Sequence, residues 1–284
     1  MGLIGTREML GDAFRGGYAV GGFVAFTAEV MQAVMRESRK RRSPAMIICG
    51  PGDYALLGAN ATAKIAAALA DEAGVDVALH LDHADSYEQV VEAIEAGFTS
   101  VMIDGSQADF EQNVALTAKV VAFAHDRGIP VEAEIGAIGK VEGAAAEAGG
   151  GPRTECTDPA SAKEFVERTG CDFLAVSIGN AHGLYAKAPS LRMDLLRDIR
   201  QATGIPLVLH GGSGTPEDQL RTVVSLGVSK VNVGSEIARD FNAVYIPMLT
   251  ERRVWWAEAK QAAAAAVHGT VGRWIDVLGS AGKA

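Results

Sequence analysis

The chain has 284 residues, 48% of them hydrophobic and 21% charged, so it carries enough apolar material for one large α/β domain or two small ones. Its 26 basic and 35 acidic side chains give a net charge of −9, which argues against nucleic acid or an anionic membrane as a partner. No apolar run approaches the roughly 18 residues of a membrane span, and the first ten residues do not resemble a signal peptide. The three cysteines lack the spacing of metal ligands or of a redox pair. We therefore expect a cytoplasmic protein with reduced thiols.

Eight short apolar runs rich in β-forming residues recur along the chain. Most are continuous rather than alternating, as expected of strands buried on both faces. They lie at 20–25, 45–50, 77–82, 100–105, 130–136, 173–179, 206–211 and 228–234. Between them, apolar residues at three- and four-residue spacing predict helices, several of which end in Gly. These helical segments are 27–41, 62–74, 88–97, 115–128, 161–170 and 219–227.

Eight strand–helix units in a chain of this length predict an α/β fold of the (β/α)8 or TIM-barrel type. A doubly wound open sheet is the alternative, although it would not naturally run to eight such units. No linker or change of composition marks a second domain, so residues 1–284 are expected to form a single domain.

Two segments depart from this strand–helix rhythm. The first, 139–159, is rich in Gly and Ala and has few apolar anchors, which favours a mobile active-site loop over an inert surface insertion. The second is a further helix over 254–278, within a C-terminal helical extension of about 251–284. Its three tryptophans are expected to pack in the fold or at a subunit interface rather than to bind a ligand.

Polar side chains gather where the predicted strands end. In an α/β barrel the chemistry lies at the C-terminal ends of the strands. The residues found there are Asp82 and His83 after the third run, Asp104 and Ser106 after the fourth, Glu132 and Glu134 in the fifth, Asn180 and His182 after the sixth, His210 in the seventh, and Asn232, Gly234 and Ser235 at the eighth.

Three of these residues are histidines, His83, His182 and His210, on three different strands. Any one of them alone would more often be a hydrogen-bonded structural residue. Three neutral imidazoles that converge on one mouth favour a Zn²⁺ site with a position open for substrate. His80 lies within the strand that carries Asp82, and we expect it to form a hydrogen bond in the core or behind the metal ligands.

Two glycine-containing turns, "LHGGSGT" at 209–215 and "VNVGSE" at 231–236, follow the seventh and eighth strands. In each, small residues open a helix, so free backbone N–H groups and the helix dipole can hold a phosphate. Barrels often bind phosphate after these two strands. A metal and a phosphate cradle at one mouth imply a small phosphorylated substrate with a carbonyl to polarise.

Several motifs together resemble the class II, zinc-dependent ketose-bisphosphate aldolases, and most closely the tagatose-bisphosphate and fructose-bisphosphate branch. The motifs are "GGYAVGGFVA", "LHLDHADS", "SVMIDGS", "VEAEIGAIG", "TGCDFLAVSIGNAHGLYAKAP", "PLVLHGGSG" and "KVNVGSE". The resemblance covers essentially the whole chain. It implies a lyase with Zn²⁺, and with a second divalent metal or a monovalent cation as a further expectation. It also implies a phosphorylated sugar as substrate and a homodimer or homotetramer.

The resemblance also implies a role for each matching residue. The three histidines would bind zinc, and Asp104 and Glu134 would lie near a second or displaced metal position. Asp82 would move a proton on and off the hydroxyl of the aldehyde half, and Glu142 would exchange the proton on the enediolate carbon. The residues matching those that hold the dihydroxyacetone phosphate end are Gly183, Gly211, Ser213, Asn232, Gly234 and Ser235.

Three departures concern the aldehyde end of the substrate. Val24 stands where the family usually has Asn, and Gly50 stands near a usual Ser or Thr, with Asp53 added. The segment "MLTERRVWW" is shortened but keeps Arg253, which matches an arginine associated with the distal phosphate. We expect an altered aldehyde-side pocket, because a valine cannot donate to a phosphate. The alternative is that the ordinary substrate is retained through Arg253.

Two other functions remain as alternatives. A zinc hydrolase on a barrel would also use several histidines and an aspartate, but it usually has an HxH pair on its first strand and needs no phosphate cradle. A non-catalytic sugar-phosphate binding barrel would not need both Asp82 and Glu142 beside the metal.

Overall fold

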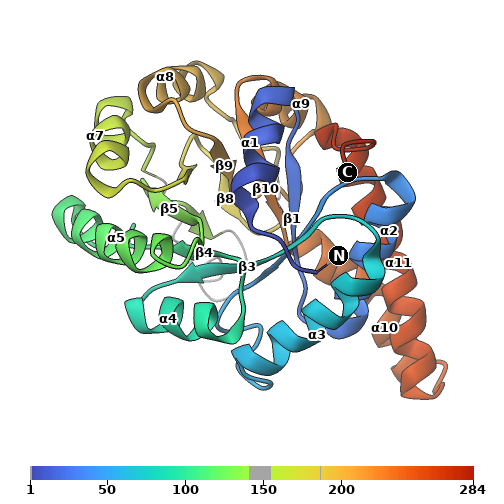
Figure 1. The fold of residues 1–284 in the computed structure, drawn as a ribbon. Helices are drawn as coiled ribbons and strands as arrows, with labels where there is room; N and C mark the ends of the chain where they lie inside the picture. The colour runs from blue at the N-terminus through green and yellow to red at the C-terminus, as the bar shows by residue number, and fades with distance from the viewer. Residues whose placement is uncertain (1, 141–154, 186) are drawn as a thin grey trace.

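A closed barrel of eight parallel strands forms the centre of the molecule (Figure 1), in a computed structural model that describes residues 2–140, 155–185 and 187–284. Around the barrel the strand order is β1-β10-β9-β7-β5-β4-β3-β2. The strands are β1 Val20–Val24, β2 Ala45–Cys49, β3 Val77–Ala84, β4 Ser100–Ile103, β5 Val131–Ile135, β7 Phe173–Val176, β9 Leu207–Leu209 and β10 Val228–Val233. The predicted TIM barrel is therefore confirmed, and each barrel strand overlaps one of the eight predicted runs.

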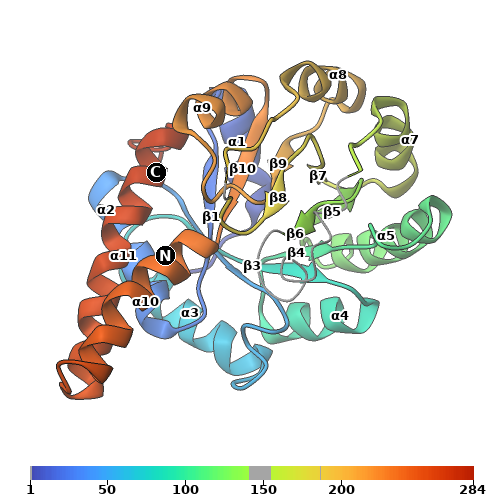
Figure 2. The ribbon, with the colours of Figure 1, turned by 180° about the vertical axis from the view of Figure 1, so that it is seen from behind.

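Helices surround the barrel (Figure 2). They are α1 Thr6–Gly16, α2 Ala28–Arg41, α3 Ala59–Ala73, α4 Tyr87–Ala96, α5 Phe110–His125, α7 Pro159–Thr169, α8 Met193–Thr203, α9 Glu217–Ser225, α10 Ser235–Thr250 and α11 Trp256–Leu278. Several begin where a side-chain oxygen accepts from a backbone N–H two or three residues into the helix, as Thr27 does for Val30 and Asp109 for Gln112. Among the described residues, none of these helices is long and apolar enough to cross a bilayer.

Three helices, α1, α8 and α10, have no counterpart among the predicted helical ranges, although the turn at 231–236 was expected to open a helix. α1 precedes the first strand and buries Met9, Leu10 and Ala13 in one cluster with inward-facing strand residues such as Met46 and Phe173. This apolar cluster closes the N-terminal end of the barrel. The polar strand ends are consequently left to form the opposite, open mouth.

The helices α10 and α11 lie side by side and extend beyond the barrel (Figure 1). The expected C-terminal helix is therefore present. The three tryptophans of this segment have different environments, which depend on how the helix packs. Trp274 is completely buried, and its indole N–H donates to Glu236. Trp255 and Trp256 are 65% and 51% exposed at the far end of the helix pair.

A short two-stranded sheet lies outside the barrel and carries one of the predicted metal ligands. Its strands are β6 Gly139–Lys140 and β8 Ala181–His182, and they pair in parallel with Lys140 opposite His182. Of the predicted loop 139–159, residues 139–140 and 155–159 are described, and Ala137 forms an isolated antiparallel bridge with Glu155. Glu142 lies outside the described residues.

Candidate active site

The end of β3 is bent so that two consecutive residues face the mouth. In a regular strand, neighbouring side chains point to opposite faces, so Asp82 and His83 could not both reach one site. The pairing between β3 and β4 shifts register between Leu81 and Ala84, and His83 has φ 48°, a left-handed conformation that few non-glycine residues adopt. This local strain turns His83 toward the mouth beside Asp82, and such strain is concentrated at functional sites.

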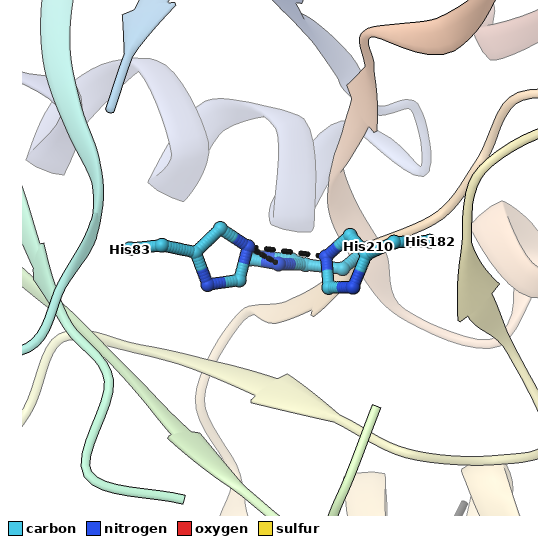
Figure 3. Close-up of side chains that lie close together, drawn as sticks. All are labelled: His83, His182 and His210. Carbon is cyan, nitrogen blue, oxygen red and sulfur yellow. Dashed lines mark hydrogen bonds between the residues drawn. The ribbon is translucent and has the colours of Figure 1, made fainter. Parts of the chain in front are cut away.

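The three predicted histidines meet at the mouth of the barrel (Figure 3). The Nε2 atom of His83 lies 3.1 Å from Nε2 of His182 and 2.9 Å from Nδ1 of His210. Tetrahedral zinc with Zn–N bonds near 2.0–2.1 Å separates ligand nitrogens by about 3.3 Å. These nitrogens are thus nearly at the spacing of three ligands on one ion.

Carboxylates surround His83 and give the site a negative field. The His83 Nδ1–H donates to Oδ2 of Asp104 at 2.9 Å, so in the neutral imidazole the lone pair is on Nε2, which faces the other histidines. Burial lowers the pKa of His83, but Asp82, Asp104 and Glu134 outweigh burial and raise the pKa to about 9. The structure therefore favours positive charge at this point, as a metal ion would supply.

A second group of metal-compatible atoms overlaps the first. His83, Asp104 and Glu134 each offer one ligand atom, all within 4.8 Å of one another. Burial, followed by the charge of Asp104, raises the pKa of Glu134 to about 8. Its Oε2 atom is buried and has no hydrogen-bond partner among the described residues. A buried carboxylate oxygen without a partner is costly, so a cation at this position fits the residues present.

Asp82 is buried beside the histidines and held by one amide. Oδ1 of Asp82 accepts a hydrogen bond of 3.0 Å from Nδ2 of Asn232. Burial raises the pKa of Asp82, but the nearby His83, Lys230 and His210 outweigh it, so the net shift is downward. The structure thus keeps Asp82 ionised, as a proton acceptor needs to be. Asn232, predicted at the phosphate end, here also orients Asp82.

The two glycine-containing turns are joined to each other at the mouth. The Oγ of Ser213 accepts from the backbone N–H of Glu236 at 3.2 Å, and the Glu236 carboxylate accepts from Gly214 N–H at 2.9 Å. Gly234 caps α10, and Ser235 is the first residue of that helix. These contacts hold the loop after β9 against the N-terminal end of α10. They use the N–H groups of Gly214 and Glu236, so a phosphate at this helix terminus would bind to neighbouring N–H groups.

Gly211 packs so closely against the neighbouring loop that no side chain fits. A Cβ at Gly211 would lie 1.9 Å from the carbonyl oxygen of Ala181, next to His182, and its φ is 66°. We expect Gly211→Ala to lower the free energy of unfolding by more than about 2 kcal/mol, from steric overlap and a left-handed backbone together. Gly204→Ala is the matched control, because Gly204 has φ 69° and open space around it. It should cost only about 1 kcal/mol. Equal losses in urea unfolding would contradict this account.

A pocket of about 400 Å³ opens beside the glycine-containing turns. Its lining joins the α10 N-terminus to the ends of β1 and β2 and consists of Val24, Phe26, Asp53, Leu184, Gly234, Ser235, Ala238 and Arg239. Oδ2 of Asp53 accepts from the backbone N–H of Gly50 at 2.8 Å. Burial raises the pKa of Asp53. The first two departures, at Val24 and at Gly50 with Asp53, thus lie on one side of the mouth.

Arg253 is not brought to this mouth within the chain. It is exposed and lies in the turn between α10 and α11, at the end of the helix pair that extends beyond the barrel (Figure 1).

Glu132, Lys230 and His80 form a buried polar layer beneath the histidines whose arrangement the sequence did not reveal. Glu132 and Lys230 are completely buried and joined at 2.8 Å. His80 is buried and forms hydrogen bonds in the core, as expected: its Nδ1 lies 2.8 Å from Oγ of Ser100 and its Nε2 lies 3.4 Å from Nζ of Lys230. The one signal in the sequence was a lysine in the middle of the apolar run "VSKVNV", since lysine is almost never fully buried without a partner.

Comparisons with known proteins identify the family of the chain. The sequence profile of the family "Fructose-bisphosphate aldolase class-II" matches residues 4–283. A fructose-bisphosphate aldolase of Geobacillus stearothermophilus is 42% identical over 239 residues, which are 83% of this chain and 82% of that protein. The chain belongs to the class II fructose-bisphosphate aldolase family.

Two solved structures extend the comparison to the coordinates. The YdjI aldolase from Escherichia coli K12 is 34% identical, with a TM-score of 0.88 over 99% of both chains. A fructose-bisphosphate aldolase from Campylobacter jejuni, 21% identical with a TM-score of 0.78, covers 100% of this chain and 97% of its own and shows the shared fold. As a class II aldolase, the protein is a carbon–carbon lyase rather than a zinc hydrolase or a non-catalytic binding barrel.

Proposed function

We propose that this class II aldolase reversibly cleaves a ketose phosphate or bisphosphate to dihydroxyacetone phosphate and an aldehyde, with Zn²⁺ as its cofactor. The observation that carries the proposal is the convergence of His83, His182 and His210 within ligand distance beside the buried carboxylate of Asp82. A metal-binding group next to a proton acceptor meets the two needs of aldol cleavage without a Schiff base.

The three histidines are the proposed zinc ligands, and Asp104 orients His83. Asp104 and Glu134, with His83, are the proposed ligands of a second or displaced cation. When bound, zinc supplies Lewis-acid polarisation of the substrate carbonyl and so stabilises the charge that develops on the ketone half.

Asp82 is the proposed base. As the C3–C4 bond breaks, the C4 hydroxyl gives its proton to Asp82 and becomes the aldehyde, while the bonding electron pair moves toward the ketone carbonyl. In the condensation direction Asp82 returns the proton. Asn232 holds the carboxylate in place through its 3.0 Å hydrogen bond, so Asp82 needs no reorganisation when the proton moves.

The ketone-side carbon must then take up a proton to give dihydroxyacetone phosphate. We assign this step to Glu142. Glu142 lies outside the described residues, so this assignment rests on the family resemblance of the sequence around it. A carboxylic acid is a suitable donor for this proton.

The phosphate of the ketone half is assigned to the backbone N–H groups around Gly211, Ser213, Gly234 and Ser235, with Gly183 beside His182. The contacts between the loop after β9 and the start of α10 support this assignment. Backbone amides at a helix N-terminus bind a dianion without basic side chains, which is consistent with the acidic net charge of the chain.

The aldehyde half is proposed to differ from glyceraldehyde 3-phosphate. Val24 offers no hydrogen bond to a distal phosphate, and the carboxylate of Asp53 on the wall of the same pocket would repel it. The ordinary bisphosphate remains the alternative if Arg253 of a partner subunit completes the pocket in a homodimer or homotetramer. The exposed position of Arg253 at the end of the α10–α11 pair is compatible with such a contact.

A coupled assay for dihydroxyacetone phosphate release across a panel of ketose phosphates, with and without chelator, tests the proposal. Activity should be lost on chelation and restored by Zn²⁺. Full activity in a preparation shown by metal analysis to contain no zinc would overturn it. Ketose 1-phosphates with tails other than glyceraldehyde 3-phosphate should be preferred over fructose or tagatose bisphosphate.

Replacing Val24 with Asn is expected to increase kcat/KM for the bisphosphates about tenfold. The added amide could donate to a distal phosphate, and a hydrogen bond to a charged group contributes about 1.5–3 kcal/mol. The ratio of kcat/KM for bisphosphate to that for a ketose 1-phosphate is the measurement, because it cancels losses common to both substrates. Wild-type enzyme that already cleaves both equally, with no change on substitution, would contradict an altered pocket.

A further inference from the structure

A continuous line of buried polar side chains runs through the barrel interior below the metal-binding histidines. At its upper end, His210 Nε2–H donates to Oε1 of Glu132 at 2.8 Å, and Lys230 Nζ donates to Oε2 of the same carboxylate at 2.8 Å. All three side chains are completely buried. They lie above the apolar layer that α1 closes, so water does not separate any of these pairs from its partner.

The line continues from Lys230 to the first helix. Nζ of Lys230 lies 3.4 Å from Nε2 of His80, and His80 Nδ1 lies 2.8 Å from Oγ of Ser100. Since an ammonium group can only donate, His80 Nε2 is the acceptor and its Nδ1–H donates to Ser100. The hydroxyl of Thr6, the first residue of α1, also donates to Ser100 at 2.8 Å. The direction of each hydrogen bond between Ser100 and the mouth is therefore fixed by groups that can only donate or only accept.

A fully buried ion pair is a poor way to stabilise a barrel core. Removing two charges from water costs several kcal/mol per ion, and apolar residues of similar volume often serve as well or better. The neighbouring interior positions show that this barrel can be filled by apolar side chains such as Met46, Met102 and Phe173. Glu132 and Lys230 lie between this apolar layer and the metal-binding histidines. Their burial is explained if their hydrogen bonds orient a side chain of the metal site.

What these hydrogen bonds determine is the tautomer of His210. A carboxylate has no hydrogen to donate, so the Glu132–His210 contact places the imidazole proton on Nε2. Nδ1 of His210 then carries the lone pair, and this is the atom that lies 2.9 Å from Nε2 of His83. Lys230 Nζ donates to the second oxygen of Glu132 at 2.8 Å and so fixes the rotation of the carboxylate.

We propose that Glu132 and Lys230 are positioning residues that fix the tautomer and orientation of His210 for metal binding, with His80 as the support behind Lys230. The inference rests on the proposed function only in taking His210 as a zinc ligand. An outer partner of a metal-binding histidine typically changes metal affinity 10- to 100-fold when it is lost.

Paired substitutions test this proposal without leaving a single buried charge. The double variant Glu132→Leu with Lys230→Met removes both charges and the acceptor of His210. The matched double variant Glu132→Gln with Lys230→Met removes the same charges but keeps an amide oxygen that can accept from Nε2–H. Zinc affinity is measured by competition with a chromophoric chelator. We expect the Leu/Met protein to bind zinc 10- to 100-fold more weakly than wild type and the Gln/Met protein to recover most of that loss.

A spectroscopic measurement of the His210 tautomer tests the proposal independently of activity and of zinc affinity. Long-range ¹⁵N–¹H correlation spectra of zinc-free wild-type protein should show His210 as the Nε2–H tautomer, and the Leu/Met variant should show a mixture. The Nδ1–H tautomer in wild type would overturn the proposal, as would wild-type zinc affinity in a folded Leu/Met variant. If zinc proved irrelevant to cleavage, the proposed function would fail, whereas the tautomer result would stand by itself.

Discussion

Substitution of Asp82 by Ala is expected to reduce the rate of cleavage by about 10²- to 10⁴-fold, the usual contribution of a positioned general base. Asp82 is buried next to His83 and accepts a hydrogen bond from Asn232. It does not belong to either group of side chains that could hold a metal ion. Zinc content should therefore remain at the wild-type level. The measurements are kcat for dihydroxyacetone phosphate release and metal content of the same preparation.

The control for Asp82→Ala is Asp85→Asn. Asp85 is an exposed carboxylate just after β3, so its loss changes charge near the mouth without removing a buried group. This variant should keep full activity. A variant Asp82→Asn, which keeps the shape of the side chain, should be as inactive as the alanine variant if proton transfer is the role. Activity retained in Asp82→Asn would show that Asp82 acts by shape and hydrogen bonding alone.

Substitution of His83 by Asn is expected to reduce both zinc binding and activity. His83 lies at the centre of the site, with one ring nitrogen on Asp104 and the other facing His182 and His210. Asn is chosen because it tolerates the φ of 48° better than most residues, so the end of β3 should keep its shape. Losing several kcal/mol of Lewis-acid stabilisation corresponds to a fall in kcat/KM of about 10³-fold.

The matched control for His83→Asn is His125→Asn on α5. His125 also forms a hydrogen bond to a carboxylate, that of Asp172 at 2.8 Å, but it lies on the outer helical layer rather than at the mouth. The His125→Asn variant should bind as much zinc per chain as the wild-type protein. One zinc per chain with full activity in His83→Asn would exclude His83 from the metal site and with it the proposed arrangement of three ligands.

Much of this site could be predicted before the fold was known. Parallel strands in a barrel end at one mouth, so His83, His182 and His210 could be placed together from the strand pattern alone. The glycine-containing turns after β9 and β10 followed from the same rule. The family resemblance then supplied the roles of Asp82, Asp104 and Glu134, and the structure places their side chains around the same histidine.

Other features depended on contacts between residues far apart in the sequence. Strand alternation argued against Asp82 and His83 sharing a face, and only the register shift and left-handed backbone of His83 resolve this. The position of Arg253, far along an extended helix pair, depends on how α10 packs on α11. No local pattern encodes that packing.

The sequence by itself determined the barrel, because buried strands and amphipathic helices impose periodicities that can be read locally, and it determined which strand ends carry the polar groups. The tertiary structure alone decided which of these groups touch. Glu132 is paired with Lys230 and His210, and His80 with Lys230 and Ser100, across separations of up to 150 residues. A buried polar side chain needs a hydrogen-bond partner. The amino-acid sequence does not show which residue that partner is, because the contact depends on barrel closure and strand register.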